Sequence, residues 1–290
     1  MFNNIVWLHV ESTTRCNAWC PFCPRNKRGY GLADDLVIQD LNIDRLGEVC
    51  DVMPELHTLQ FCGNLGDPLA AKNFDEQMQY AVENKKVENI IINTNGSLRS
   101  KDWWKNLATF CNEVNLQVWF AIDGNKTNHS YYRQGTNYDK IIENATAFIN
   151  NGGQAVWQYI LFHHNKNNLI ECFNKSQELG FTQFKVIKNV RSDQASFHYR
   201  TGESLDIKNY TENTVISNNE KHDFVYKKNC MHISYPSMYL AANGKIHPCC
   251  YLYGENVSQK NVADSFDNKN FLSTCLKSCG HIESSVKTIH

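Results

Sequence analysis

The chain is organised around the segment Glu11-Ser-Thr-Thr-Arg-Cys16-Asn-Ala-Trp-Cys20-Pro-Phe-Cys23-Pro-Arg25, which directly follows the apolar run 5–10. Its three cysteines have the spacing C-x3-C-x2-C. Thiolates so close in sequence can surround one side of a metal site, and these soft ligands favour iron-sulfur clusters, zinc or cuprous copper. A structural zinc site normally needs a fourth ligand, whereas a cluster held by three cysteines keeps one iron open for a small molecule.

Composition limits the classes of protein to consider. The chain has 290 residues, enough for one large domain and a small one, and its 29 basic and 30 acidic residues give a net charge of -1. This balance predicts neither a nucleic-acid partner nor binding to an anionic membrane. The N-terminus lacks the features of a signal peptide, and no apolar run is long enough to span a bilayer. We therefore expect a cytoplasmic protein.

Twelve cysteines are many for a reducing compartment, so clustered cysteines indicate metal ligands rather than disulfides. The first group is the loop just quoted. A second group lies near the C-terminus and contains Cys230, Cys249, Cys275 and Cys279, with Cys250 as an alternative to its neighbour. The isolated residues Cys50, Cys62, Cys111 and Cys172 are expected to be ordinary small buried side chains.

Short apolar runs alternate with amphipathic stretches as far as about residue 190, which is typical of repeated βα units on a parallel sheet. The expected strands are 5–10, 57–62, 88–93, 114–122, 155–162 and 183–187. The expected helices are 41–52, 73–84, 100–111, 138–150 and 169–179. This periodicity fits either a barrel or an open doubly wound sheet.

The cysteine loop resembles the signature of the radical S-adenosylmethionine (SAM) enzymes, including the aromatic Phe22 just before the third cysteine. The resemblance implies a partial (β/α)6 barrel over residues 1–190. It also implies a 4Fe-4S cluster on Cys16, Cys20 and Cys23, whose open iron binds SAM. One electron then cleaves SAM to methionine and a 5′-deoxyadenosyl radical. The simpler alternatives are a zinc knuckle or unrelated buried thiols.

A second motif follows the second expected strand, at Gly63-Asn-Leu-Gly66-Asp67-Pro68. It resembles the Gly-Gly-Glu-Pro motif that holds the amino group of SAM in this family, with an Asp in place of the Glu and two residues between the glycines. Glycines suit such a loop because they let the backbone approach a ligand closely. Taken alone, a turn of this composition would be weak evidence.

Further polar residues stand where chemistry is expected in a barrel, at the carboxyl ends of strands. Asn95 and Asp123 follow the third and fourth strands and resemble SAM contacts, and Arg133 resembles a partner of the SAM carboxylate. Ala121 replaces the serine that usually contacts the ribose. Gln158 interrupts an otherwise apolar strand, so we expect it to point into a functional lumen with the cofactor-binding residues.

Residues 191–228 are polar and predict a linker or a segment that covers the active site. Beyond them, Asn243-Gly244 predicts a two-residue hairpin turn. The spacing of Cys230, Gly244 and Cys249, with the closing Cys275-x3-Cys279, resembles the small SPASM or twitch domain, here 229–290. The resemblance implies one auxiliary 4Fe-4S cluster, although the last pair is usually C-x2-C. A four-cysteine zinc site is the alternative.

Three functions remain open at this point. The first is a radical SAM enzyme that oxidises or otherwise modifies a small polar metabolite, with flavodoxin or ferredoxin as electron donor. The second is modification of a peptide or protein, against which we note that the chain begins almost at the first strand and leaves no room for a leader-binding domain. The third is a zinc or iron-sulfur protein without catalytic activity.

Overall fold

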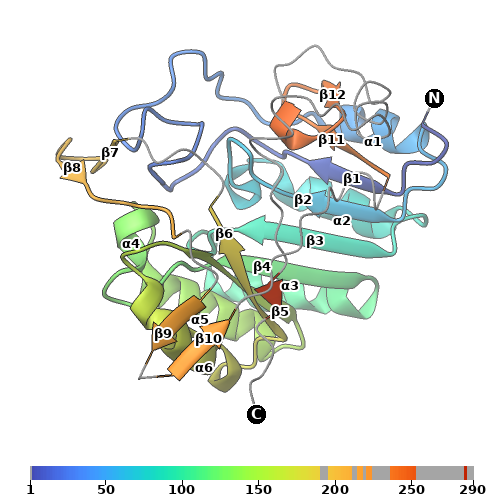
Figure 1. Cartoon of the computed structure of the whole chain (residues 1–290). Helices are drawn as coiled ribbons and strands as arrows, with labels where there is room; N and C mark the ends of the chain where they lie inside the picture. The colour runs from blue at the N-terminus through green and yellow to red at the C-terminus, as the bar shows by residue number, and fades with distance from the viewer. Residues whose placement is uncertain are drawn as a thin grey trace, which may run out of the picture.

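The computed structural model describes residues 2–189, 195–210, 214–217, 220–223, 236–252 and the backbone of 284–285. Parallel strands alternate with helices along the chain (Figure 1). The six strands of this repeat are β1 (Trp7–Val10), β2 (Thr58–Phe61), β3 (Asn89–Thr94), β4 (Asn115–Ala121), β5 (Gln154–Leu161) and β6 (Gln183–Lys188). The helices are α1 (Ile43–Asp51), α2 (Phe74–Glu83), α3 (Lys101–Thr109), the short α4 (His129–Tyr132), α5 (Tyr138–Ile149) and α6 (Leu169–Glu178).

The order of the strands decides between the two architectures that periodicity allowed. The six strands lie side by side in chain order, and each pairs in parallel with the next. In a doubly wound sheet the later strands are added on the other side of the first strand, so the strand order reverses there. In this sheet β2 to β6 all follow on one side of β1. The expected partial (β/α)6 barrel is therefore confirmed, and the observed strands and helices begin and end close to their expected limits.

Strands from the C-terminal part extend the same sheet at both edges. Strand β11 (Ser237–Leu240) pairs in parallel with β1, and β12 (Ile246–His247) pairs antiparallel with β11. Strand β13 (Ser284–Ser285) pairs antiparallel with β6. The hairpin that the sequence placed in a separate C-terminal unit thus adds its first strand directly to the barrel sheet.

The turn between β11 and β12 differs from the two-residue turn that Asn243-Gly244 predicts. Residues 241–245 form the connection, closed by hydrogen bonds from Gly244 N to Ala241 O and from Ala241 N to Lys245 O, each 2.9 Å long. Gly244 has a φ of +80°, the left-handed conformation that ends this longer type of hairpin turn. The Asn-Gly pair therefore completes a wider turn, and the prediction of a two-residue loop was wrong.

Side-chain caps define where several helices begin. Asn42 accepts a hydrogen bond from Arg45 N, and Ser100 accepts one from Trp103 N. Asn137 caps α5 in the same way. Each of these bonds satisfies one of the backbone N–H groups that a first helical turn leaves without a partner, which explains part of the demand for asparagine in this chain.

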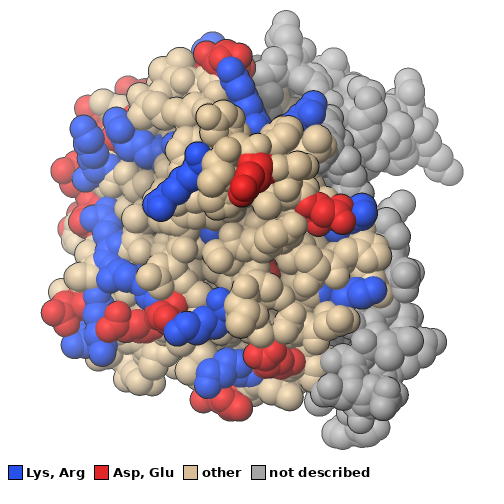
Figure 2. Space-filling view, turned by 90° about the vertical axis from the view of Figure 1, so that its left-hand side faces the viewer, with Lys and Arg blue, Asp and Glu red and all other residues tan. Residues whose placement is uncertain are grey.

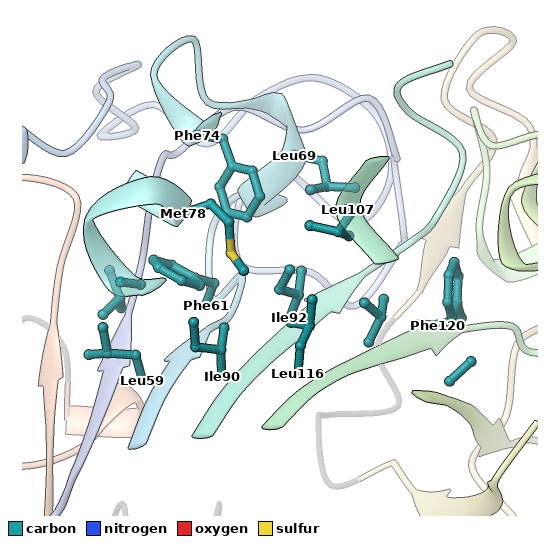
Figure 3. Close-up of a cluster of buried hydrophobic side chains, with 14 of the residues drawn as sticks. Leu59, Phe61, Leu69, Phe74, Met78, Ile90, Ile92, Leu107, Leu116 and Phe120 are labelled. Atoms are coloured by element: carbon teal, nitrogen blue, oxygen red, sulfur yellow. The ribbon is translucent and has the colours of Figure 1, made fainter. Parts of the chain in front are cut away.

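The two faces of the sheet have opposite character. Figure 3 shows the outer face, where strand residues such as Leu59, Phe61 and Ile92 pack against Phe74 and Met78 of α2. Because side chains alternate along a strand, the neighbouring residues point to the inner face. There the sheet carries polar side chains, among them Gln60, Asn93 and Gln158, and all three line a pocket.

Two small hairpins lie outside the main sheet. They are β7 (Ser196–Phe197) with β8 (Ser204–Leu205), and β9 (Thr214–Ser217) with β10 (Glu220–Asp223). Across the part of the chain that the structure describes, none of the helices is both long and apolar enough to cross a membrane.

We predict that Trp104→Ala lowers the free energy of unfolding by about 3–5 kcal/mol. The Trp104 side chain is fully buried, its ring lies 5.0 Å from that of Phe120, and its indole N–H donates to Leu98 O. Urea denaturation measures the change. Tyr30→Ala is the control, because this ring is 54% exposed and its loss should change stability by no more than about 0.5 kcal/mol. Equal losses in both variants would contradict the assigned core.

Candidate functional site

One pocket on the inner face collects most of the residues that the sequence singled out, although Asp123, Phe22 and Pro68 do not line it. Its walls contain the cysteines of the first loop, residues of the glycine motif, and polar residues from β3, from β5 and from the end of β6. Figure 2 views the side toward which the β1 and β3 arrows of Figure 1 point, and charged side chains stand mostly around its edge. The pocket thus lies at the carboxyl ends of the parallel strands, where barrels of this kind place their chemistry.

The cysteine loop brings three thiols to this pocket. Cys16 Sγ accepts a hydrogen bond from Ala18 N at 3.3 Å, and the Cys23 N–H donates to Cys20 O at 2.9 Å. Asn95 Nδ2 lies 3.9 Å from Cys16 Sγ. Burial raises the pKa values of the Cys16 and Cys20 thiols, so in the absence of a cation these sulfurs favour the protonated form. A cluster or metal that replaces the protons would remove this penalty.

The donor set of the loop fits an iron-sulfur cluster. Cys16, Cys20 and Cys23 all line one pocket, and thiolates are the ligands that hold such clusters.

The glycine motif packs against the cysteine loop with no room for a side chain. A Cβ on Gly66 would lie 1.9 Å from Thr13 O, and one on Gly63 would lie 1.6 Å from Gly66 O. Asp67 N also donates to Arg15 O at 2.8 Å. The glycines were expected to allow close approach of a ligand. The structure shows that they also let two loops of the protein lie in direct backbone contact.

Asp67 organises the end of β3. Its carboxylate accepts hydrogen bonds from the Thr94 hydroxyl, from Asn95 N and Nδ2, both at 2.7 Å, and from Leu69 N. Burial raises the pKa of Asp67, and these donors oppose the rise. Pro68 is buried at the start of a short 3-10 turn, η1 (Pro68–Ala70), that Asp67 caps. The carboxylate thus holds Asn95 in place at the pocket wall.

Asp123 and Arg133 form a buried ion pair, with Arg133 Nε 2.5 Å from Asp123 Oδ2. Burial lowers the pKa of Arg133, but the Asp123 carboxylate, together with Cys20 and Tyr132, raises it above its usual range, so the guanidinium stays charged. Arg133 Nη1 lies 3.7 Å from Cys20 Sγ. A fixed positive charge therefore stands beside the cysteine loop, where it can stabilise thiolates or an anionic ligand.

His129 supports this pair in a neutral form. Its Nδ1 accepts the Asp123 N–H at 3.2 Å, so the other nitrogen, Nε2, carries the proton and donates to Thr136 Oγ1 at 3.0 Å. Burial, together with the charge of Arg133, lowers the pKa of His129 from 6.5 to about 3. The imidazole is thus an uncharged support for the loop that carries Arg133.

Glu11 belongs to the site, although the sequence analysis gave it no role. Its Oε1 accepts hydrogen bonds from Leu65 N at 2.5 Å and from Gly66 N at 3.2 Å, and its Oε2 accepts one from the Tyr239 hydroxyl. The side chain is buried, and burial raises its pKa. An acidic residue directly after the first apolar strand was the available signal, because strand ends carry function in this architecture.

Two other expected site residues have different surroundings. Gln158 lines the pocket from β5 and receives a hydrogen bond from Asn93 Nδ2 at 3.4 Å. Phe22 packs between Tyr132 and Phe162, with ring centroids at 5.9 and 6.1 Å. The aromatic ring thus supports the cysteine loop from its side, in a small apolar cluster separate from the main core.

The structure describes only part of the second cysteine group. Cys249 is buried, and Cys250 lines the pocket, where its carbonyl accepts a hydrogen bond from Asn64 Nδ2 at 3.2 Å. Cys230, Cys275 and Cys279 lie outside the described residues. Cys62 also lines the pocket, 3.9 Å from His9 Nδ1, so the expectation that it is an ordinary core residue was wrong. Cys50 and Cys172 are core residues as expected.

Residues 195–210, from the segment expected to be a linker or cover, lie against the cysteine loop. Tyr199 stacks on Trp19 with ring centroids 6.0 Å apart. Gln134 bonds this segment twice, donating to Phe197 O and accepting from Tyr199 N. The segment therefore packs on the outside of the loop that carries the three thiols.

Comparison with known proteins places the fold. No protein-family model matches the chain, and no curated protein matches it. Among solved structures, SuiB of Streptococcus suis bound to S-adenosylmethionine is 17% identical with a TM-score of 0.61, and the match covers 95% of this chain and 71% of that one. SuiB bound to precursor peptide SuiA is 16% identical with a TM-score of 0.61, and the match covers 95% of this chain and 70% of that one. The structure of anSMEcpe with bound AdoMet is 19% identical with a TM-score of 0.51, and the match covers 63% of this chain and 49% of that one. At these identities the likeness concerns the fold.

The neutral imidazole of His129 predicts a pH-dependent stability. As pH falls from about 6.5 toward about 3, the unfolded chain binds a proton at this residue and the folded chain does not, so the free energy of unfolding decreases. Urea denaturation at about pH 7 and about pH 4 measures the loss of unfolding free energy between the two pH values. In His129→Gln this loss should be smaller, by up to the contribution of one bound proton. His163→Gln, at an exposed position, is the control and should leave the dependence unchanged.

Proposed function

We propose that the chain is a radical SAM enzyme. The observation that carries the proposal is that the three thiols of the C-x3-C-x2-C loop share one pocket with the glycine motif, Asn95 and Arg133. Spacing, donor chemistry and position at the carboxyl end of a partial barrel all agree with that assignment. The similarity of the fold to SuiB, whose structure holds SAM, supports it.

Cys16, Cys20 and Cys23 would hold a 4Fe-4S cluster, which would supply the electron for cleavage of SAM and so the radical chemistry that removes a hydrogen atom from the substrate. The residues of the chain bind and orient. The loop 63–66 faces the pocket and is held by Glu11, and Asp67 fixes the orientation of Asn95. Arg133 keeps a positive charge beside Cys20, suited to a carboxylate of the cofactor.

For the substrate we keep two candidates. A small polar metabolite agrees with a pocket lined by amides and hydroxyls. A peptide is favoured by the structure of SuiB with the precursor peptide SuiA, because the match covers 95% of this chain. In either case we propose flavodoxin or ferredoxin as electron donor, a cytoplasmic location, and an auxiliary 4Fe-4S cluster in a twitch-like unit (229–290) on Cys230, Cys249, Cys275 and Cys279.

The competing proposal is a zinc or iron-sulfur protein without catalysis. Both proposals use the same thiols. They differ in the metal that is bound and in whether 5′-deoxyadenosine is formed. The glycine motif and the Asp67 network favour the enzyme, because a purely structural metal site needs no adjoining pocket with fixed amides and a cation.

The first test counts iron and product after anaerobic reconstitution with iron and sulfide. We expect about eight irons per chain for two 4Fe-4S clusters, and 5′-deoxyadenosine after addition of SAM and dithionite. Cys16→Ala should abolish the product, whereas Cys50→Ala, at a buried core position, should not. About four irons with product would keep the enzyme and remove the auxiliary cluster. Zinc in place of iron, with no product under any reductant, would refute the proposal.

Gly66→Ala should weaken SAM binding by at least about tenfold, a loss of roughly 1.4 kcal/mol. The added Cβ would meet Thr13 O at 1.9 Å and force the glycine motif away from the cysteine loop. Calorimetric titration of SAM into the reconstituted protein measures this. Gly47→Ala is the matched control, since its Cβ would have a nearest contact of 3.8 Å on helix α1, and SAM affinity should not change. Equal affinities for both variants would contradict the assigned loop.

A further inference from the structure

Three carboxamides on the inner face of the barrel form one hydrogen-bonded chain, which we call the amide relay. Trp7 Nε1 donates to Gln60 Oε1 at 3.1 Å. Gln60 Nε2 donates to Asn93 Oδ1 at 2.7 Å, and Asn93 Nδ2 donates to Gln158 Oε1 at 3.4 Å. The relay therefore starts on β1, crosses β2 and β3, and ends on β5 at the pocket.

The first donor fixes the direction of the whole relay. An indole nitrogen can only donate, whereas a carboxamide can turn its oxygen or its nitrogen toward a neighbour. Gln60 must therefore present its oxygen to Trp7, which turns its nitrogen toward the oxygen of Asn93. Asn93 in turn presents its nitrogen to the oxygen of Gln158. Gln158 is left with its NH2 group, and within the described residues this group has no hydrogen-bond partner. The relay thus ends in a donor at the pocket.

A small side chain on β4 makes the last link available. Strand β4 lies between β3 and β5, and Ala121 is the residue of β4 that pairs with Gln158. Ala121 also lines the pocket. The β4 residue that pairs with Asn93 is Trp119, so the bond from Asn93 to Gln158 runs diagonally across β4. A methyl group at Ala121 offers no hydroxyl that could compete for the Gln158 amide. The replacement of serine by alanine, unexplained by the resemblance, acquires a physical reason here.

The charged groups of the same pocket are already paired. Asp67 accepts hydrogen bonds from Thr94, Asn95 and Leu69, and Arg133 is paired with Asp123. The relay itself contains no ionisable group. A hydrogen-bond donor that is held in one orientation favours a ligand with an acceptor at that point and disfavours a cationic group, because a cation would face the positive end of the N–H bonds.

We propose that the amide relay is the substrate-recognition surface of this pocket and that Gln158 Nε2 donates to a carbonyl oxygen of a substrate that carries no positive charge beside that oxygen. The inference rests on the proposed radical SAM function and deepens it by naming the substrate chemistry. It also moves Gln158 from the expected cofactor contacts to the substrate contacts. A ligand without the acceptor leaves the terminal donor unpaired, which is the basis of discrimination.

The test uses three pools of probe compounds with the reconstituted protein. The first contains neutral peptides with acetylated and amidated ends, the second contains neutral keto-sugars and lactones, and the third contains diamines and amino sugars. Two readouts are taken: 5′-deoxyadenosine formed above the rate without substrate, and calorimetric binding to the SAM-loaded protein without reductant. We expect the first or the second pool to give the larger signal in both, and which one does so identifies a peptide or a small metabolite as the source of the carbonyl group.

Two variants test the direction of the relay. Trp7→Phe removes the donor that fixes it and should weaken binding of the best neutral compound by roughly tenfold. Its matched control is Trp103→Phe, which removes an indole N–H bond of 2.8 Å to Asp75 on the outside of the barrel and should not change that binding. Gln158→Glu replaces the terminal donor by an acceptor and should reverse the preference, so that amines bind better than neutral compounds.

The outcomes separate this inference from the proposed function. A wild-type preference for the cationic pool, no signal from any pool, or equal effects of Trp7→Phe and Trp103→Phe would overturn the relay as a recognition surface. If 5′-deoxyadenosine does not form at all, the radical SAM proposal fails. The binding measurement needs no cleavage and still reports on the relay.

Discussion

The site depends on one buried carboxylate. Glu11 directly follows the first strand, and its two oxygens bond in two directions, to the backbone of the glycine motif and to Tyr239 on β11. A carboxylate buried in this way is stable only while its donors are in place. The cysteine loop, the glycine motif and the C-terminal hairpin are thus held in one arrangement by a single side chain, with glycines where the loops meet.

Much of the fold could be predicted from the sequence, because each strand is a short apolar run and each helix has a regular apolar face. The cysteine spacing also indicated the chemistry of the loop. Glu11 was missed because its partners are 54 and 228 residues away, and no local pattern reports such contacts. Cys62 was taken for core since position in sequence does not tell which side of a strand end faces a pocket.

The turn at Asn243-Gly244 shows a different limit. The dipeptide indicated a reversal of the chain correctly, but the length of the loop depends on how β11 and β12 pair, and β11 is fixed by its pairing with β1. Likewise Asp67 was identified as the acidic residue of the glycine motif, and Asp123 as a polar strand end. Their actual roles, capping and orienting Asn95 in one case and pairing with Arg133 in the other, needed the neighbouring strands in place.

The pairing of β1 with β11 has a consequence for assembly. Strands β1 to β6 pair with their neighbours in chain order, so most of the sheet can form as the polypeptide is synthesised. The partner on the other side of β1 is complete only when residue 240 has been made. Until then the carboxylate of Glu11 lacks its tyrosine, and the edge of the sheet beside the cysteine loop stays uncovered. The topology therefore orders events: the thiol loop is formed early, and its enclosure is among the last steps of folding.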